Sequence, residues 1–495
     1  MTASHLPRLN RDIAACVDNA LTSSLEKTRA PGIVHLGIGA FHRAHQAVYT
    51  QCAMELEGGD WHIIGVSLRS ETVAKQLNPQ DGLYTVVERD DSGSKHSIIR
   101  AVNQVLVAPE APEKVLDAMC SSNIKVISLT VTEKGYCYHG ANADLHLEHE
   151  DIVHDLAHLN RPRSAIGFLV SAIKRRISLH LPPLTIISCD NLPNNGSLLK
   201  QMVLSFAQQI DKELARRIAS DYRFPSTMVD RMVPASTPDD LSVYAEQLGY
   251  TDQGMVLTEP FTHWVIEDSF AGPIPAWQAA GAIITKDVHA FEKMKLRLLN
   301  GCHSAIAYIG FLASKRYVSD VMQSPMLADF VLHLMHHEIL PSVEAPEGVD
   351  IRQYCKELLQ RFSNPKLQHS CYQVAMDGSQ KLPQRLLNAL QYQLTHQGIC
   401  AGISFVIAAW MQYTSGRDLH NAPIAVQDPL AKPLSELASD NVQEWVLNML
   451  AFDAVFPKNL AYNARLVSEI CGWLRRIRDD KNIELSIAAL LKEIS

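Results

Sequence analysis

Gly32-Ile-Val-His-Leu-Gly37-Ile-Gly39-Ala-Phe41-His-Arg-Ala-His-Gln46 is the stretch that decides the fold. It opens with a short apolar run typical of a buried strand, and two glycines follow before a helix can begin. Strand, glycine turn and helix in that order predict a dinucleotide-binding turn, in which glycines let the backbone approach a pyrophosphate at the positive end of the helix. We therefore expect Gly37 and Gly39 at a cofactor. His42 stands where a third glycine is usual, so the turn alone is equally compatible with an unrelated role.

Further apolar runs extend this turn into a parallel sheet. We expect strands at residues 61–66, 84–87, 123–132 and 183–188, with helical patterns at residues 164–178 and 196–218 as crossover connections. Because ligands bind beyond the carboxyl ends of parallel strands, the loops that carry Thr132, Glu133 and Asn191 should line the reactive end of the cofactor. The predicted N-terminal part is completed by a short helix within residues 12–25, an extended segment over residues 224–234 and a strand over residues 279–285.

The end of the strand at residues 61–66 bears on the choice of cofactor. An NAD site usually carries Asp or Glu there to bind the adenosine ribose hydroxyls, but this strand continues into Ser67-Leu-Arg69-Ser70. Arg69 instead suits the 2′-phosphate of NADP. The residues by themselves leave both cofactors open.

Length and patterning indicate more than one domain. A chain of 495 residues exceeds what a single core usually supports, and helical patterns dominate from residue 287 onward. We expect an α/β fold, with a Rossmann-like dinucleotide-binding domain over residues 1–286 and a mostly α-helical substrate and catalytic domain over residues 287–495.

The first helix of the second domain carries the candidate chemistry, in Lys295-Leu-Arg-Leu-Leu-Asn300-Gly-Cys-His303-Ser304. On an α-helix that advances about 100° per residue, Lys295, Asn300 and His303 share one side. A lysine of lowered pKa can accept a proton from a hydroxyl, while an amide and an imidazole can hydrogen-bond the oxygen as it becomes negative. Oxidation of a secondary alcohol without a metal requires this set, and we expect the helix to face the cofactor across a cleft. A surface lysine with two capped polar neighbours would have the same spacing.

A basic, glycine-containing loop follows at Met376-Asp-Gly-Ser-Gln-Lys381-Leu-Pro-Gln-Arg385. Arg361, Lys381 or Arg385 could supply the cation for a negatively charged end of a substrate, although an exposed loop between helices has the same composition. Asp230 is open to two interpretations, a salt-bridged structural acid or a substrate contact.

Composition and motif spacing argue against several classes of protein. A net charge of -8 without a long basic block argues against a nucleic-acid partner. The ten cysteines are scattered without a CxxC pair, and the histidine pair in His333-Leu-Met-His-His-Glu338 lacks a third ligand at a recognisable spacing, so we expect no metal. We find no leader pattern and no run of about 18 apolar residues, which predicts a cytoplasmic protein with no membrane partner.

Five ordered motifs resemble the polyol-specific long-chain dehydrogenases, the mannitol dehydrogenase family. They are Gly37-x-Gly39-x-Phe-His-Arg-Ala-His, Thr130-Val-Thr-Glu-Lys-Gly-Tyr136, Ser188-Cys-Asp-Asn191, the segment 224–234 and Lys295-x-Arg-x-Leu-Asn-Gly-x-His-Ser304. The resemblance implies a Rossmann-like domain followed by a helical one, metal-independent chemistry and NAD as the cofactor. It also implies that Lys295 is the general base and that Asn300 and His303 stabilise the alkoxide. Asn191, Asp230 and Lys381 match family positions at the substrate or beside the lysine, and Gly37, Gly39 and Phe41 match the family's cofactor turn.

Within that family, the wording of three motifs is most similar to the fructuronate reductase (mannonate oxidoreductase) branch. The substrates implied are the sugar acids D-mannonate and D-fructuronate, whose carboxylate would meet the loop from Lys381 to Arg385. Branches that act on mannitol, arabinitol or tagaturonate share the catalytic motif and stay open. So does a nucleotide-binding sensor that has kept the fold and lost the chemistry. The resemblance favours a monomer over an oligomer.

Overall fold

The structure is a computed structural model that describes residues 6–17, 30–139 and 144–494. The chain divides into two units, Met1–His289 and Ala290–Ser495. The helix expected within residues 12–25 is present as α1 (Arg11–Val17), and residues 18–25 lie outside the described part of the chain.

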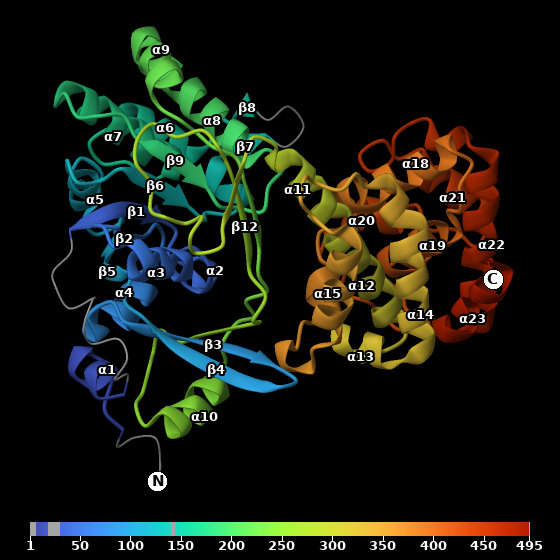
Figure 1. Cartoon of the computed structure of the whole chain (residues 1–495). Coiled ribbons are helices and arrows are strands. Elements are labelled where there is room, and N and C mark those ends of the chain that lie inside the picture. The colour runs from blue at the N-terminus through green and yellow to red at the C-terminus, as the bar shows by residue number, and fades with distance from the viewer. Residues whose placement is uncertain (1–5, 18–29, 140–143, 495) are drawn as a thin grey trace. The chain divides into compact units, whose positions relative to one another are not determined.

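A five-stranded parallel sheet forms the centre of the first unit (Figure 1). Its strands are β1 (Pro31–Leu36), β2 (His62–Ser67), β5 (Val102–Val107), β6 (Val126–Leu129) and β9 (Thr185–Ser188). They follow the order β5-β2-β1-β6-β9, so the chain adds strands first on one side of β1 and then on the other. This is the doubly wound arrangement, and the predicted α/β fold with an N-terminal Rossmann-like domain is confirmed.

The strands of this sheet bury side chains on both faces. Val34 and Leu36 lie in one core and Ile33 in another. The first core includes α5 (Pro112–Met119), α7 (Ala165–Ser178) and α8 (Asn195–Ile210), and the second includes α3 (Gln46–Glu57) and α4 (Thr72–Leu77). Figure 1 shows α7 and α3 on opposite sides of the sheet. Because both faces are covered, the strands read in the sequence as continuous apolar runs.

The strand predicted at residues 84–87 is present but lies in a different sheet. β3 (Tyr84–Asp90) pairs antiparallel with β4 (Gly93–Ile99) and parallel with β11 (Val256–Thr258). The place beside β2 in the parallel sheet belongs to β5 instead. β5 was not predicted from apolar runs because Asn103 and Gln104 interrupt its apolar residues.

Residues 224–234 contain a strand, as expected for an extended segment. This strand is β10 (Thr227–Asp230), which pairs antiparallel with β12 (His263–Glu267). β13 (Ile283–Thr285) pairs parallel with β12, and it is shorter than the strand predicted over residues 279–285. The remaining elements are α2 (Ala40–Ala44), β7 (Tyr138–His139), β8 (Asp144–Leu145), α6 (Glu150–Ala157) and α10 (Pro238–Leu248).

The single helix expected over residues 196–218 is two helices. α8 ends at Ile210, and α9 (Lys212–Asp221) begins after Asp211. Asp211 has extended backbone angles, and its side chain accepts a hydrogen bond from the backbone N–H of Glu213 at 2.9 Å. The continuous pattern is therefore broken by an aspartate that caps a new helix.

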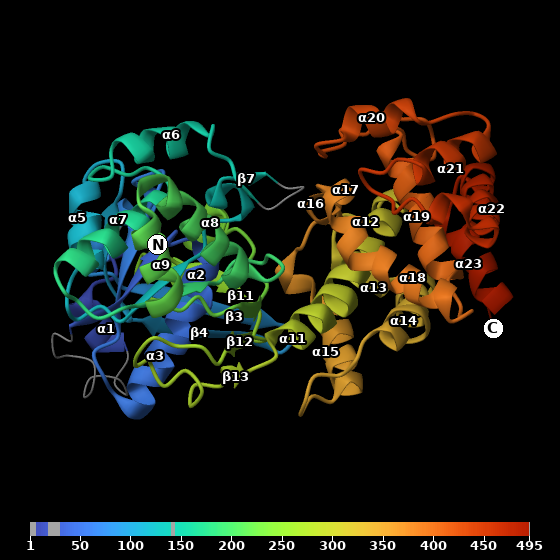
Figure 2. The same ribbon diagram turned by 90° about the horizontal axis from the view of Figure 1, so that it is seen from above.

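Helices form the second unit (Figures 1 and 2). They are α11 (Val288–Lys295), α12 (Cys302–Leu312), α13 (Val318–Gln323), α14 (Pro325–His333), α15 (Ile351–Ser363), α16 (Cys371–Ala375), α17 (Gly378–Leu382), α18 (Asn388–Thr395), α19 (Ala401–Thr414), α20 (Ala431–Glu436), α21 (Val442–Leu450), α22 (Ala464–Asp480) and α23 (Ile483–Ile494). α19 is buried from Gly402 to its end and packs against α12 and α22. The predicted mostly helical second part is confirmed.

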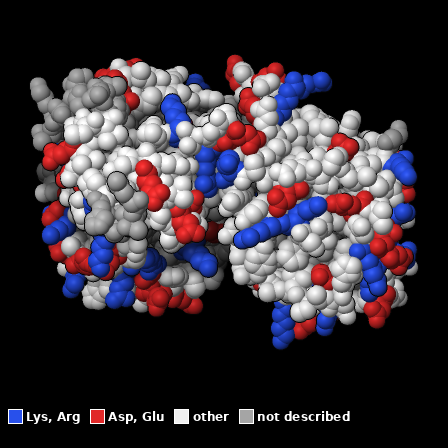
Figure 3. Space-filling view, turned by 90° about the horizontal axis from the view of Figure 1, so that it is seen from below, with Lys and Arg blue, Asp and Glu red and all other residues white. Residues whose placement is uncertain are grey.

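Acidic and basic side chains are interspersed on the face of the molecule that Figure 3 shows. This mixture agrees with the modest net charge of -8. Among the described residues, no helix has both the length and the apolar character needed to cross a membrane.

Candidate active site

The glycine turn after β1 has the backbone that a dinucleotide-binding loop needs. Gly37 has φ of 92°, and a Cβ there would collide with the carbonyl oxygen of Thr130. Its N–H donates to the carbonyl of Val66 at 2.8 Å, which fixes the turn against β2. At Gly39 a Cβ would meet only one atom within 4 Å, so a side chain there would fill open space beside the turn. That space fits a phosphate approaching the backbone.

His42 replaces the third glycine by packing under the turn. Its ring stacks on that of His35 in β1, with ring centroids 3.4 Å apart. Burial lowers the pKa of His42 to about 3 and that of His35 well below its usual value. Both rings are therefore neutral, and His35 hydrogen-bonds the hydroxyls of Ser128 at 2.8 Å and Thr130 at 2.9 Å. Neutral imidazoles thus carry out the close packing of helix on strand for which a third glycine is otherwise used.

Asp190 joins the loops that follow β6 and β9. Its carboxylate accepts from the N–H groups of Val131 at 3.1 Å and Thr132 at 2.8 Å, and from the Tyr136 hydroxyl at 2.7 Å. Thr132 has φ of 62°, an unusual angle for a residue other than glycine. Burial raises the pKa of Asp190 despite these hydrogen bonds. Asp190 and Tyr136 lie within two of the sequence motifs, but their contact is not predictable from the sequence because only the fold brings the two loops together.

The other predicted residues of this region differ in exposure. Thr132, Glu133 and Asn191 are exposed at the carboxyl ends of the strands, as expected for ligand-facing loops. Glu133 accepts from the Tyr138 hydroxyl at 3.0 Å. Asp230, at the end of β10, is 4% exposed.

Phe41 and His45 stack in α2 and at its end, with centroids 5.0 Å apart. The Nε2 of His45 donates a hydrogen bond to the backbone carbonyl of His263 over 3.0 Å. Burial lowers the pKa of His45 to about 3, and the nearby Asp230 carboxylate opposes that shift. Asp230 therefore lies close to the glycine-turn helix within the first unit.

The lysine motif lies on a helix that is not α-helical throughout. α11 ends at Lys295, residues Leu296–Gly301 form a π-helical turn, and α12 begins at Cys302. The regular 100° spacing expected from the sequence therefore does not hold across this motif. π turns inside α-helices are frequent at functional sites.

Lys295, Asn300 and His303 are all buried, with 7%, 5% and 6% of their surface exposed. A surface lysine with two capped neighbours is therefore the wrong description of this motif. The Asn300 Nδ2 and the His303 Nε2 are buried without a hydrogen-bond partner in the described part of the chain. Unpartnered buried polar atoms are costly, and these two suit a ligand oxygen.

His303 lies among cationic side chains in the second unit. Burial is the largest cause that lowers its pKa, followed by His369 and by the positive charges of Arg385, Arg361 and Lys295. Its ring also contacts Phe362, with centroids 4.7 Å apart. The imidazole is therefore neutral, so it can offer one N–H to a substrate oxygen.

Lys381 and Arg385 lie on one continuous helical segment. Lys381 is in α17, and Arg385 is in the π-helical turn Pro383–Leu387 that continues it. Lys381 donates to the carbonyls of Val374 at 3.4 Å and Met376. Burial, with a further contribution from Arg385, lowers the pKa of Lys381 to about 8. The structure thus brings Arg361 and Arg385 into the electrostatic surroundings of His303, and Lys381 into those of Arg385.

Arg69 lies in the first unit, two residues beyond the end of β2. Its Nη2 lies 2.9 Å from the Asp151 carboxylate. Among the described residues, no group of three or more His, Cys, Asp and Glu side chains is placed to hold a metal ion.

Family models match almost the whole chain. The mannitol dehydrogenase Rossmann domain matches residues 31–279, and the mannitol dehydrogenase C-terminal domain matches residues 287–478.

Proteins of two named activities have similar sequences. The D-mannonate oxidoreductase of Escherichia coli is 41% identical over 454 residues, which cover 90% of this chain and 93% of that protein. The mannitol 2-dehydrogenase of Aspergillus fumigatus is 39% identical over 457 residues, which cover 91% of each chain. The solved structure of the ternary complex of Pseudomonas fluorescens mannitol 2-dehydrogenase with NAD and D-mannitol superposes with a TM-score of 0.85 at 32% identity, over 98% of this chain and 99% of that one.

Proposed function

This chain belongs to the mannitol dehydrogenase family, and we propose that it interconverts D-mannonate and D-fructuronate. At the coarser level it is an NAD-linked oxidoreductase that acts on a CH–OH group of a polyol or sugar acid. The open backbone at Gly39 and the exposed loop at Thr132 would hold the dinucleotide, with Phe41 beside the turn. NAD supplies a hydride acceptor when bound.

Lys295 is the proposed general base for the alcohol. In the oxidative direction it accepts the hydroxyl proton while the C–H bond breaks and its electron pair leaves as hydride. Asn300 Nδ2 and His303 Nε2 donate hydrogen bonds to the oxygen as negative charge gathers on it. Their burial without a partner in the described residues supports this role, because the donors need no reorganisation when the substrate arrives.

The positive charge around His303 is the observation that carries the choice of a sugar acid. Arg385 and Arg361 both act on His303 electrostatically, and Lys381 acts on His369 next to it. A neutral polyol gains little from so many cations, whereas a carboxylate pairs with them through charge-assisted hydrogen bonds. The proposed substrate carboxylate is held by Arg385, Arg361 or Lys381.

Initial rates with NADH and D-fructuronate, D-tagaturonate and D-fructose at neutral pH test the substrate. We expect kcat/KM for fructuronate to exceed that for fructose by about 100-fold or more, as two charged hydrogen bonds would give. A preference for fructose would instead identify a mannitol dehydrogenase, in line with the Aspergillus relative. Cofactor binding without turnover of any of the three would identify a sensor.

A further inference from the structure

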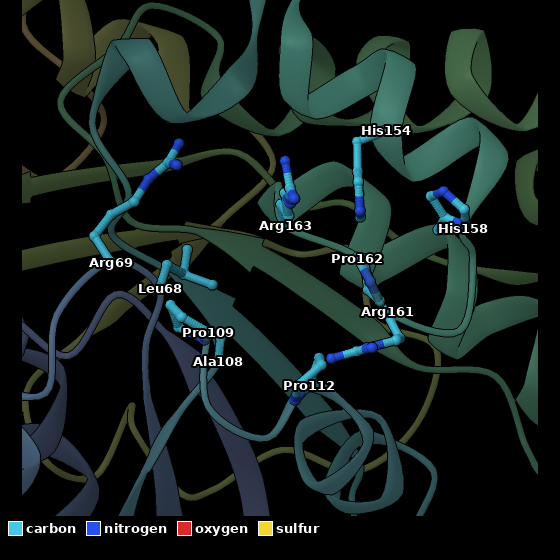
Figure 4. A pocket seen from close by; sticks show the side chains of 10 residues that line it. All are labelled: Leu68, Arg69, Ala108, Pro109, Pro112, His154, His158, Arg161, Pro162 and Arg163. Atoms are coloured by element: carbon cyan, nitrogen blue, oxygen red, sulfur yellow. The ribbon is translucent and has the colours of Figure 1, made fainter.

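A pocket of about 560 Å³ lies beyond the ends of β2 and β5 in the first unit. Leu68 and Arg69 line it after β2, Pro109 and Pro112 line it after β5, and the segment with Arg161 and Arg163 closes it (Figure 4). Its volume is within the range of cofactor-sized sites.

The position of this pocket in the sheet corresponds to the adenosine half of a dinucleotide. The glycine turn follows β1, and the pocket lies on the β2 and β5 side of it. In a doubly wound sheet the pyrophosphate lies at that turn and the ribose of adenosine lies at the end of the second strand. The prolines and Leu68 offer an apolar surface to the adenine ring.

The polar side chains that line the pocket are arginines and histidines, and none of its described lining residues is acidic. Figure 4 shows Arg69 at the β2 end and Arg163 between it and the two histidines, His154 and His158. The acid that binds ribose hydroxyls in NAD sites is absent from the end of β2. The adenosine ribose hydroxyls of NAD would therefore face the N–H donors of arginines here, and not a carboxylate.

Arg69 keeps donors for a ligand although it is paired. Its Nη2 contacts Asp151 at 2.9 Å, and 68% of its side chain is exposed. A guanidinium has five N–H groups, so several stay available for phosphate oxygens. The Asp151 carboxylate is 7% exposed and holds the guanidinium in place.

The arginine segment is anchored by Asp155. Its carboxylate accepts from the backbone N–H of Arg163 at 2.7 Å and of Ser164 at 2.8 Å. Within the described part of the chain, the guanidinium groups of Arg161 and Arg163 have no hydrogen-bond or ion-pair partner. The backbone of the segment is therefore fixed, and among the described residues its two guanidinium groups remain available to a ligand.

We infer that this pocket binds the 2′-phosphate of NADP(H) through Arg69 and Arg163, so that the enzyme uses NADPH as well as NADH. The use of NADPH in turnover rests on the proposed dehydrogenase function. The binding of the 2′-phosphate at the pocket does not, and it can be measured without turnover.

Calorimetric titration of the full chain with adenosine 2′,5′-bisphosphate and with AMP tests the site directly. We expect the bisphosphate to bind about 10-fold more tightly than AMP, because the extra phosphate gains charge-assisted hydrogen bonds. Arg163→Ala should reduce that difference and weaken the binding of the bisphosphate more than that of AMP. Arg216→Ala, an exposed arginine of α9 paired with Glu213, is the matched control and should keep the difference.

Equal affinity of the wild type for both nucleotides would overturn the inference. So would displacement of the bisphosphate by an equal concentration of inorganic phosphate, because the pocket would then be a general anion site. With fructuronate, kcat/KM for NADPH should be within about 10-fold of that for NADH, and Arg163→Ala should lower the NADPH value more than the NADH value. Nucleotide discrimination without turnover of any sugar acid would reject the proposed function and leave this inference standing.

Discussion

The guanidinium of Arg385 donates a hydrogen bond to the hydroxyl of Ser304 over 3.0 Å. Arg385 lies in one π-helical turn, and Ser304 follows another, the turn between Lys295 and Cys302. This contact ties the basic segment to the helix that carries the proposed base. Burial lowers the pKa of Arg385 to about 10, so the side chain still carries its charge at neutral pH.

Arg385→Ala should lower kcat/KM for fructuronate by about 10- to 100-fold, the loss expected for a charged hydrogen bond. Its effect on fructose should be much smaller, since that substrate has no carboxylate. Steady-state kinetics with both substrates provide the measurement. Ser304→Ala is the control, because it removes the internal hydrogen bond and leaves the charge. An equal loss with both substrates would mean that Arg385 only supports the helix.

Lys295→Ala should lower turnover by about 100-fold or more, since it removes the proposed general base. Binding of NADH, followed by its fluorescence, should stay unchanged. Lys293→Ala, on the same helix two residues earlier, should leave the rate near that of the wild type. Near-normal turnover of the Lys295 variant would remove this residue from the role of base.

The parallel sheet was largely predictable because its strands are continuous apolar runs beside a glycine turn. Its edge strand β5 was not, because Asn103 and Gln104 interrupt the run. The apolar stretch from Tyr84 instead pairs with β4, and the pattern of a single apolar run does not predict which strand it pairs with.

Site prediction reached its limit where geometry depends on the fold. The spacing of Lys295, Asn300 and His303 assumed a regular α-helix, but the composition of residues 296–301 does not predict the π-helical turn found there. Asp190 contacts Thr132 across 58 residues of sequence, a relationship that no local pattern contains.

The pH dependence of substrate binding should report Lys381. Because burial and Arg385 lower its pKa to about 8, the ammonium is charged below that pH and neutral above it. If it helps to bind the carboxylate, kcat/KM for fructuronate should fall as pH rises through about 8. Lys381→Arg should shift that fall to higher pH, because a guanidinium stays charged. A wild-type profile that is flat through this range, or one that the variant leaves unchanged, would assign the role to another residue.

Gly301→Ala should destabilise the second unit. A Cβ at this position would lie 2.9 Å from the carbonyl oxygen of Arg385, so the two π-helical turns would have to separate. Overpacking of this kind costs about 1–3 kcal/mol. Thermal unfolding followed by circular dichroism measures the loss. Gly472→Ala is the control because its Cβ meets nothing within 4 Å in α22, and it should be neutral or stabilising. Equal melting temperatures for the two variants would contradict the close approach.

Asp190→Asn should weaken cofactor binding through the loop after β6. The carboxylate accepts from two backbone N–H groups and from the Tyr136 hydroxyl, and an amide can present only one oxygen to them. Thr132 would then lose the contact that holds its φ at 62°, and KM for NADH should rise about 10-fold. Tyr136→Phe removes only the hydroxyl and should have a smaller effect. Amide hydrogen exchange over residues 131–136 should quicken in the Asn variant. Unchanged exchange with a raised KM would place the effect of Asp190 outside this loop.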